Sequence, residues 1–305
     1  MLKKIVVHGG NAHLDEVVAC AVALAAQKIC WPQDDQNLAP VIERHDPSVE
    51  ELEDPEVLVL DVGGRYEPEK SNFDHHQLPR ENRESAMVLF AKNVGLPGGG
   101  SLEVDNLAFA MERMFPWFMT RSVVDCQGPF AAAKEAGVEW KTVDRFRGPA
   151  EDLLLAAFVN ASDEKRYEIV APLGEMIVNA YSAYDELLGL TNGFVDECGE
   201  SLYETLKRLG VDAVAVDFRG IDGKLVDAAG DAILDECGAE IAVFDDNRGD
   251  GWTVLRRNDS PKFDFAKCAD IPGVLFAHKG GFVAKTKAKD VQVLDEILAA
   301  GYIAK

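Results

Sequence analysis

The sequence lacks several features that would place it in a common class of protein. Its six cysteines include no C-x-x-C pair, which predicts reduced and mostly buried thiols. The longest apolar stretch, Val17 to Ala26, is about half of the roughly 20 residues that a helix needs to cross a bilayer. We therefore expect no membrane-spanning segment.

Basic side chains are also scarce. The chain carries 31 Lys and Arg against 53 Asp and Glu, a formal charge of −22. This charge repels a polyanion at long range, so we expect no sequence-independent binding to duplex DNA, although one local site could still hold a phosphate. The charge is uneven: residues 251–305 contain nine basic and six acidic side chains, a net of +3, which leaves −25 for residues 1–250.

The remaining composition is that of a soluble globular protein. With 305 residues, 47% of them hydrophobic, the chain can form two domains of roughly 100–200 residues each. Residues 1–8 pass directly into a strand-like run, without the apolar region and cleavage site of a signal peptide, and this pattern favours a cytoplasmic protein.

Short β-branched runs alternate with helical patterns in the first part of the chain. Strands are expected at residues 4–7, 41–44 and 55–61, with a helix at residues 14–29 between the first two. This rhythm predicts an α/β fold with a parallel sheet. Ligand sites in such sheets lie beyond the carboxyl ends of the strands, where His8 and Asp61 stand.

A helical connector and a second α/β domain are expected next. Residues 149–188 have a helical pattern that stops near Thr191-Asn192-Gly193. Helices then follow at residues 200–209, 225–237 and 290–300, and strands at 213–218, 241–244, 252–256, 274–277 and 282–284. We therefore predict a catalytic domain over residues 1–190, which includes the connector, and a smaller C-terminal α/β domain over residues 191–305.

Histidines are concentrated near the N-terminus. Five of the six lie in the first quarter of the chain: His8, His13, His45, His75 and His76. The segment from His8 to Glu16 contains two imidazoles and two carboxylates around a glycine-bearing loop, which lets side chains converge on one point. The same loop could instead be a polar turn in which Asn11 or His13 caps the helix.

Three further acidic or histidine-bearing segments extend this pattern. Asp61 ends an apolar strand, Asp74 directly precedes His75 and His76, and Asp125 follows an apolar pair. Alone, Asp61 could be an ordinary acid at the end of a strand, the Asp74–His76 run could be a solvated polar turn, and Asp125 would mean little. Together the segments supply a mixed nitrogen and oxygen ligand set that is large enough for two divalent cations bridged by one carboxylate. Its members are His8, His13, Asp15, Asp61, His75 and Asp125.

Four ordered segments resemble a known family. They are His8-x4-His13-x-Asp15-Glu16, residues 61–64 (DVGG), residues 74–77 (DHHQ), and residues 271–278 (IPGVLFAH) with Gly281-Phe282. In this order they resemble the melanocyte-proliferating-gene (Myg) family of metal-dependent hydrolases, within the DHH (Asp-His-His) phosphoesterase superfamily. The resemblance implies a two-domain DHH-like α/β architecture with the active site in the cleft between the domains.

The resemblance also implies roles for individual residues. One metal would be bound by His8, His13 and Asp61. The other would be bound by Asp15, Asp61, His75 and Asp125, with Asp61 as the bridge. His76 would face the scissile phosphate, and Asp74 would hold the neighbouring residues in place. The segment Cys126-Gln127-Gly128 departs from the more usual Asp-Asn-Gly of the family.

The ligand set favours a transition metal. His13 stands where most of the superfamily has Asp, and an imidazole ligand favours Mn²⁺, Zn²⁺, Fe²⁺ or Co²⁺ over Mg²⁺. We expect Mn²⁺ first. In the C-terminal domain, candidates for substrate contact are His278, Lys279, Gly280, Gly281 and Arg256, with Lys285 as a further basic side chain. For His278 a buried structural role is an equal alternative.

These features together predict a two-metal phosphoesterase that hydrolyses phosphodiester bonds with a metal-activated hydroxide. The family is associated with 3′→5′ RNA exonuclease activity, so short RNA, oligonucleotides or nucleotides are the expected substrates. One alternative is a hydrolase resembling an inorganic pyrophosphatase. Another is a non-catalytic metal-binding or nucleotide-binding regulatory module. The physiological substrate stays open, as does a homodimeric state.

Overall fold

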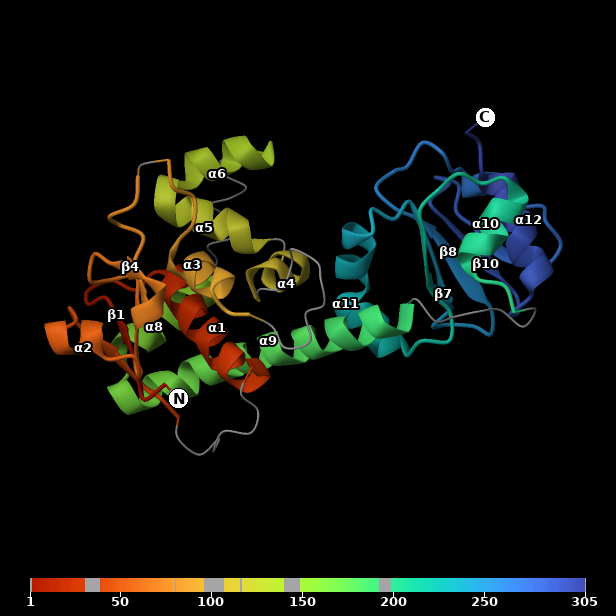
Figure 1. Cartoon of the computed structure of the whole chain (residues 1–305). Helices are drawn as coiled ribbons and strands as arrows, with labels where there is room; N and C mark the ends of the chain where they lie inside the picture. The colour runs from red at the N-terminus through yellow and green to blue at the C-terminus, as the bar shows by residue number, and fades with distance from the viewer. Residues whose placement is uncertain are drawn as a thin grey trace. The chain divides into compact units, whose positions relative to one another are not determined.

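A computed structural model of the chain describes residues 2–30, 39–79, 81–95, 107–115, 117–139, 149–191 and 199–304. The chain divides into two compact units, residues 1–179 and 180–305. Each unit contains one five-stranded sheet (Figure 1). The predicted α/β class is therefore confirmed. The division falls within a long helix, α9 (Asp163–Thr191), and the functional boundary expected after residue 190 stays a prediction.

The N-terminal sheet has the strand order β2-β1-β3-β5-β4. Its strands are β1 (Lys4–Val7), β2 (Val41–Arg44), β3 (Val57–Leu60), β4 (Tyr66–Glu67) and β5 (Asn72–Phe73). The pairs β1–β2, β1–β3 and β3–β5 are parallel, and β4 is antiparallel to β5 at the edge. Because β1, β3 and β5 are parallel neighbours, their carboxyl ends meet at one edge of the sheet.

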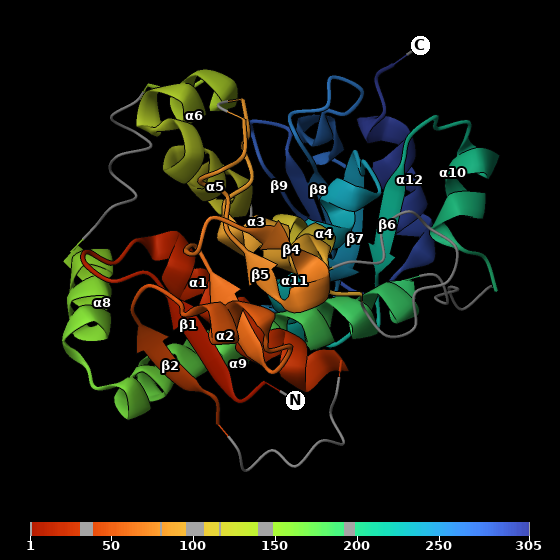
Figure 2. The ribbon, with the colours of Figure 1, turned by 60° about the vertical axis from the view of Figure 1, so that its left-hand side comes forward.

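Helices cover both faces of this sheet. Successive strand residues point to opposite faces, so alternate side chains pack against different helices. Ile5 of β1 and Leu58 of β3 belong to the main core with α1 (Leu14–Cys30) and α3 (Ala86–Lys92). Val6 and Val59 point to the opposite face, where they form a smaller cluster with α2 (Val49–Glu53). Figure 2 shows α2 in front of the strands. Residues 15–26 of α1 are all buried, as its apolar surface predicts.

Further helices complete the N-terminal unit. They are α4 (Leu107–Met114), α5 (Trp117–Gln127), α6 (Pro129–Ala136), α8 (Pro149–Asn160) and α9. The helical region expected at residues 149–188 is formed by two helices, α8 and α9. Arg166 of α9 is buried at their junction, where it donates hydrogen bonds to the carbonyl oxygens of Phe158 and Ile42, each at 3.0 Å. α9 ends at Thr191; Asn192 and Gly193 lie outside the described residues.

The C-terminal sheet has the strand order β6-β7-β8-β10-β9. Its strands are β6 (Ala215–Phe218), β7 (Ile241–Asp245), β8 (Trp252–Arg256), β9 (Val274–Ala277) and β10 (Val283–Thr286). Only β6 and β7 pair in parallel. One core joins this sheet to α10 (Leu202–Leu209) and α12 (Val291–Gly301), and α11 (Gly223–Glu236) connects β6 to β7.

Two expectations from composition can be compared with the described residues. Cys20 and Cys268 are buried, Cys30 and Cys126 are half-buried, and Cys237 is exposed. All five are free thiols, but most of them are not fully buried, so that part of the prediction is wrong. Within the described ranges, no helix combines the length and hydropathy that a bilayer crossing requires.

Candidate metal centre

Three neighbouring strand ends deliver the central side chains. His8 directly follows β1, Asp61 follows β3, and Asp74, His75 and His76 follow β5. Asp61 is buried and has a φ of +61°, a left-handed conformation that few non-glycine residues adopt and that is concentrated at functional sites. Its backbone N–H donates to the carbonyl oxygen of Phe73 at 3.1 Å, so the sheet itself holds this conformation.

Two helices bring further side chains to the same edge. His13 immediately precedes α1, and Asp15 and Glu16 lie buried in its first turn. Asp125 lies in the last turn of α5. A buried serine fixes that helix: the Ser122 hydroxyl donates to the carbonyl oxygen of Arg83 at 2.8 Å and accepts from the N–H of Ser85 at 2.7 Å.

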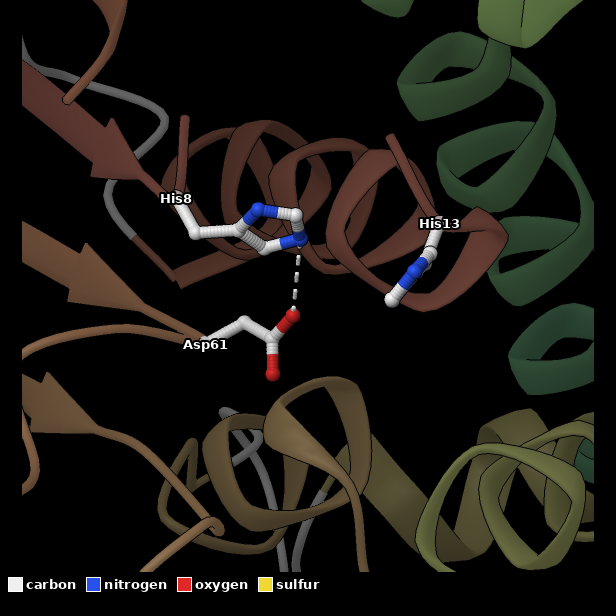
Figure 3. A group of neighbouring side chains, drawn as sticks. All are labelled: His8, His13 and Asp61. Atoms are coloured by element: carbon white, nitrogen blue, oxygen red, sulfur yellow. Dashed lines mark ion pairs between the residues drawn. The ribbon is translucent and has the colours of Figure 1, made fainter. Parts of the chain in front are cut away.

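The first predicted ligand set, His8, His13 and Asp61, forms a compact group. One ligand atom from each residue lies within 4.8 Å of the others. Figure 3 shows the three side chains around a shared space, with Nε2 of His8 3.5 Å from Oδ2 of Asp61. Nδ1–H of His8 donates to the carbonyl oxygen of Gly9 at 2.6 Å. This hydrogen bond leaves Nε2 available as a metal ligand.

The second predicted set, Asp15, Asp61, His75 and Asp125, is also compact, with ligand atoms within 4.8 Å of one another. Nε2 of His75 lies 3.0 Å from Oδ1 of Asp61 and 2.9 Å from Oδ2 of Asp125. Asp61 thus presents one carboxylate oxygen to His8 and the other to His75. A carboxylate with this disposition suits a bridge between two cations.

Asp15 shows that the residues fit a cation. Both of its carboxylate oxygens are buried and have no hydrogen-bond partner in the part of the chain that the structure describes. Burial, together with the nearby carboxylates of Asp61 and Asp125, holds the pKa of Asp15 well above its usual value. A buried carboxylate without partners is costly unless a positive charge compensates it. The donor set therefore fits one or two divalent ions.

The imidazoles respond to the same excess of negative charge. A hydrogen bond to Glu16 raises the pKa of His8 to about 9. Burial alone would lower the pKa of His75, but hydrogen bonds to Asp125 and Asp61 raise it to about 12. Without metal, these two protonated rings supply part of the positive charge that the carboxylates require. A metal ion bound at these nitrogens would take the place of their protons.

His76 and Asp74 stand beside this centre. Asp74 accepts hydrogen bonds from the backbone N–H of His76 at 2.9 Å, from its Nδ1 at 2.7 Å, and from the N–H of Gly64 at 2.6 Å. Burial would raise the pKa of Asp74, but these hydrogen bonds hold it below its usual value. The His76 side chain remains 60% exposed. Asp74 therefore orients an imidazole that solvent can reach.

The structure adds residues that the sequence analysis did not assign to the site. Glu16 is fully buried, with Oε2 2.9 Å from Nε2 of His8 and Oε1 3.2 Å from a guanidinium nitrogen of Arg44. Cys126 Sγ lies 3.5 Å from Nδ1 of His75. The sequence contains a signal for Glu16, because it is an acid in the first turn of a helix that is otherwise apolar on all sides. It contains none for Arg44.

A smaller acidic group surrounds His45. Ligand atoms of Glu43, His45 and Glu51 also lie within 4.8 Å of one another. The ammonium group of Lys4 contacts both glutamates, at 2.8 Å and 3.2 Å. This lysine already supplies the positive charge that a metal would bring, so the group is a local ion-pair network.

The predicted substrate residues of the C-terminal unit gather at the β9–β10 turn. The N–H of Gly280 donates to Nδ1 of His278 at 3.0 Å. Arg256 donates to the carbonyl oxygen of Phe263 at 2.9 Å, and Lys279 is exposed. Gly281 has a φ of +70°, and an added Cβ would lie 2.2 Å from a carboxylate oxygen of Asp264. These contacts give the turn its shape, while its role in substrate binding stays a prediction.

The fold and the centre define the chain as a mixed α/β protein with residues suited to metal binding. Comparison with known proteins finds a family match for its N-terminal segment. Residues 4–89 match the MYG1_exonuc family model, described as "Uncharacterised protein family (UPF0160)". The predicted resemblance to the melanocyte-proliferating-gene family is thereby confirmed for this segment. It contains His8, His13, Asp15, Asp61 and the Asp74–His76 run, but not Asp125.

Individual relatives match over about a quarter of the chain. The chain is 39% identical over 71 residues to "MYG1 protein" of Chlamydia trachomatis, covering 23% of this chain and 21% of that protein. It is 35% identical over 79 residues to "MYG1 exonuclease" of Homo sapiens and 34% over 74 residues to that of Rattus norvegicus, in both cases covering 24% of this chain and 17% of the relative. The chain thus matches about a fifth of the length of these relatives.

Proposed function

We propose that this protein is a two-metal phosphodiesterase that removes nucleotides from the ends of short RNA or other oligonucleotides. The observation that carries the proposal is the second ligand group, in which Asp15 is buried without partners beside Asp61, His75 and Asp125. Together with His8 and His13, this group would supply six ligand residues for two cations. Asp61 belongs to both ligand sets. The name "MYG1 exonuclease" of the human and rat relatives supports the choice of nucleic acid as substrate.

The metal ions and the neighbouring side chains would have different roles in hydrolysis. When bound, two divalent ions would supply Lewis acidity and lower the pKa of a bound water to near neutrality. We expect Mn²⁺ in both sites. His76 is exposed beside the group and is oriented by Asp74, so it is placed to donate a hydrogen bond to a phosphate oxygen. The described side chains therefore provide metal binding and phosphate orientation without a serine or cysteine nucleophile.

The charge balance explains how an acidic protein could bind a phosphate. Asp15, Asp61 and Asp125 contribute three negative charges, and Arg44 offsets the charge of Glu16 at 3.2 Å. Two divalent ions add four positive charges, which leaves the centre near +1. At longer range, the −25 of residues 1–250 repels extended polyanions, so the substrate would be a short chain or a chain end.

Hydrolysis assays test the proposal. Protein stripped of metal and reloaded with Mn²⁺ is given short RNA, short DNA, a cyclic dinucleotide and pyrophosphate. We expect turnover of the oligonucleotides with Mn²⁺, none after chelation, and a loss of at least 100-fold in Asp61→Ala. The matched control is Asp270→Ala at an exposed position, which should act like the wild type. Absence of metal-dependent turnover on all four substrates would refute the proposal, and turnover of pyrophosphate alone would favour a pyrophosphatase.

A further inference from the structure

A cavity adjoins the candidate metal centre within the N-terminal unit. Its volume is about 250 Å³, and three of the proposed ligand residues, His13, Asp15 and Asp125, form part of its wall. A molecule in this cavity would therefore touch the metal centre directly. Cavities that hold drug-sized ligands measure about 300–1,000 Å³, so this one suits a single ring system.

The rest of the wall is largely apolar. Leu14 of α1, Val124 of α5 and Leu155 of α8 contribute hydrocarbon side chains from three different helices. Such walls stabilise the faces of an organic ring by removing them from water. They offer nothing to inorganic pyrophosphate, which has no apolar surface to bury.

One polar pair completes the wall. Arg121 lies one helical turn before Asp125 on α5, and its Nη2 donates to a carboxylate oxygen of Glu151 at 2.6 Å. The two side chains are only 13% and 11% exposed. A guanidinium has five N–H donors and a carboxylate about four acceptor sites, so both groups retain bonding capacity. Together they present donors and acceptors side by side, as the polar edge of a nucleobase requires.

We propose that this cavity, lined by Leu155 and the Arg121–Glu151 pair, binds the base of the nucleotide whose phosphate lies at the metal centre. The inference rests on the proposed function and deepens it. The apolar walls contact the faces of the ring, and the ion pair bonds its edge. The cavity thus selects a nucleoside phosphate ester over pyrophosphate.

Two substitutions on one helix test the cavity. Leu155→Trp fills it, whereas Leu153→Trp adds the same side chain at a position that is 71% exposed. Binding of adenosine, guanosine, cytidine and uridine is measured by saturation-transfer NMR on metal-free protein, because a nucleoside carries no phosphate and needs no metal. We expect binding to the wild type and to Leu153→Trp, and affinity at least tenfold weaker for Leu155→Trp.

A kinetic measurement separates this inference from the proposed function. With Mn²⁺, Leu155→Trp should raise KM for a dinucleotide at least tenfold, while the Mn²⁺ affinity measured by calorimetry stays within threefold of the wild type. Glu151→Gln preserves the volume and should change which nucleoside binds best, which keeps the test valid if the tryptophan variant misfolds. Unchanged nucleoside binding and KM in both variants would overturn the inference. Nucleoside binding without any metal-dependent turnover would instead refute the proposed function alone.

Discussion

Asp15 offers a sharp test of the metal centre. If its carboxylate binds a metal ion, Asp15 destabilises the metal-free protein and stabilises the metal-bound protein. Its carboxylate is buried beside Asp61 and Asp125, and neither oxygen has a hydrogen-bond partner. The substitution Asp15→Asn keeps the shape but removes the charge, and its amide N–H groups can donate to the two remaining carboxylates. We therefore expect the variant to be more stable than the wild type without metal and less stable with it.

The magnitudes follow from burial and binding. A buried polar group without a partner costs about 1–3 kcal/mol, so Asp15→Asn should raise the free energy of unfolding of the metal-free protein by about that amount. A ligand at 100 times its Kd stabilises the folded state by about 2.7 kcal/mol. The wild type should gain this stabilisation from Mn²⁺. The variant should lose most of it, because Asp15 is one of the four proposed ligands of its site.

Urea unfolding followed by circular dichroism, with excess chelator and then with Mn²⁺, measures both quantities. The exposed Asp270→Asn serves as the control and should behave like the wild type in both conditions. If Asp15→Asn destabilises the metal-free protein by more than 1 kcal/mol, the carboxylate has a structural partner and our reasoning is wrong. Equal stabilisation of wild type and variant by Mn²⁺ would place the metal elsewhere.

Substitutions at three further positions have definite outcomes. Cys126→Ala removes the sulfur that lies 3.5 Å from Nδ1 of His75 and should weaken Mn²⁺ binding, measured by calorimetry, about 10-fold or more. Cys126→Ser should nearly preserve the Mn²⁺ affinity. Gly281→Ala forces a side chain into left-handed backbone against Asp264 and should cost about 2–4 kcal/mol in urea unfolding. Lys285→Met leaves Asp246 buried without its 2.6 Å partner and should cost about 3–5 kcal/mol. Because this pairing lowers the pKa of Asp246 against the opposing effect of burial, its contribution is present at neutral pH and lost in acid; unfolding curves at pH 7 and pH 3 should show a smaller pH effect in the variant.

Much of the fold could be predicted because local patterns and tertiary contacts agree. The alternating strand and helix signals predicted β1, β3 and α1 within a few residues, because residues 5–7 and 57–60 are buried in a sheet that is covered on both faces. The strand expected at residues 282–284 begins one residue later, because Gly281 and Phe282 belong to the turn that Asp264 shapes. The short pair β4 and β5 was not predicted, since two-residue strands carry no periodicity.

The candidate site could be predicted to the extent that its residues follow parallel strands. The topological rule places His8 and Asp61 at one edge, and the structure puts their side chains 3.5 Å apart. Asp125 is different, because it reaches the site from a helix and its local sequence signal was only an acid after an apolar pair. Arg44 was missed for a physical reason: its guanidinium becomes a partner of Glu16 only through the pairing of β1 with β2.

Glu16 and Arg44 also change what the overall charge means. A count of −22 treats every carboxylate alike, yet the carboxylates at this edge of the sheet differ in what compensates them. Glu16 has Arg44 and His8, and Asp61 and Asp125 share His75. Among the described residues, Asp15 has no hydrogen-bond partner for either carboxylate oxygen. Because burial makes such a group costly, the position of Asp15, rather than the size of the acidic excess, marks where a metal ion would stabilise the protein.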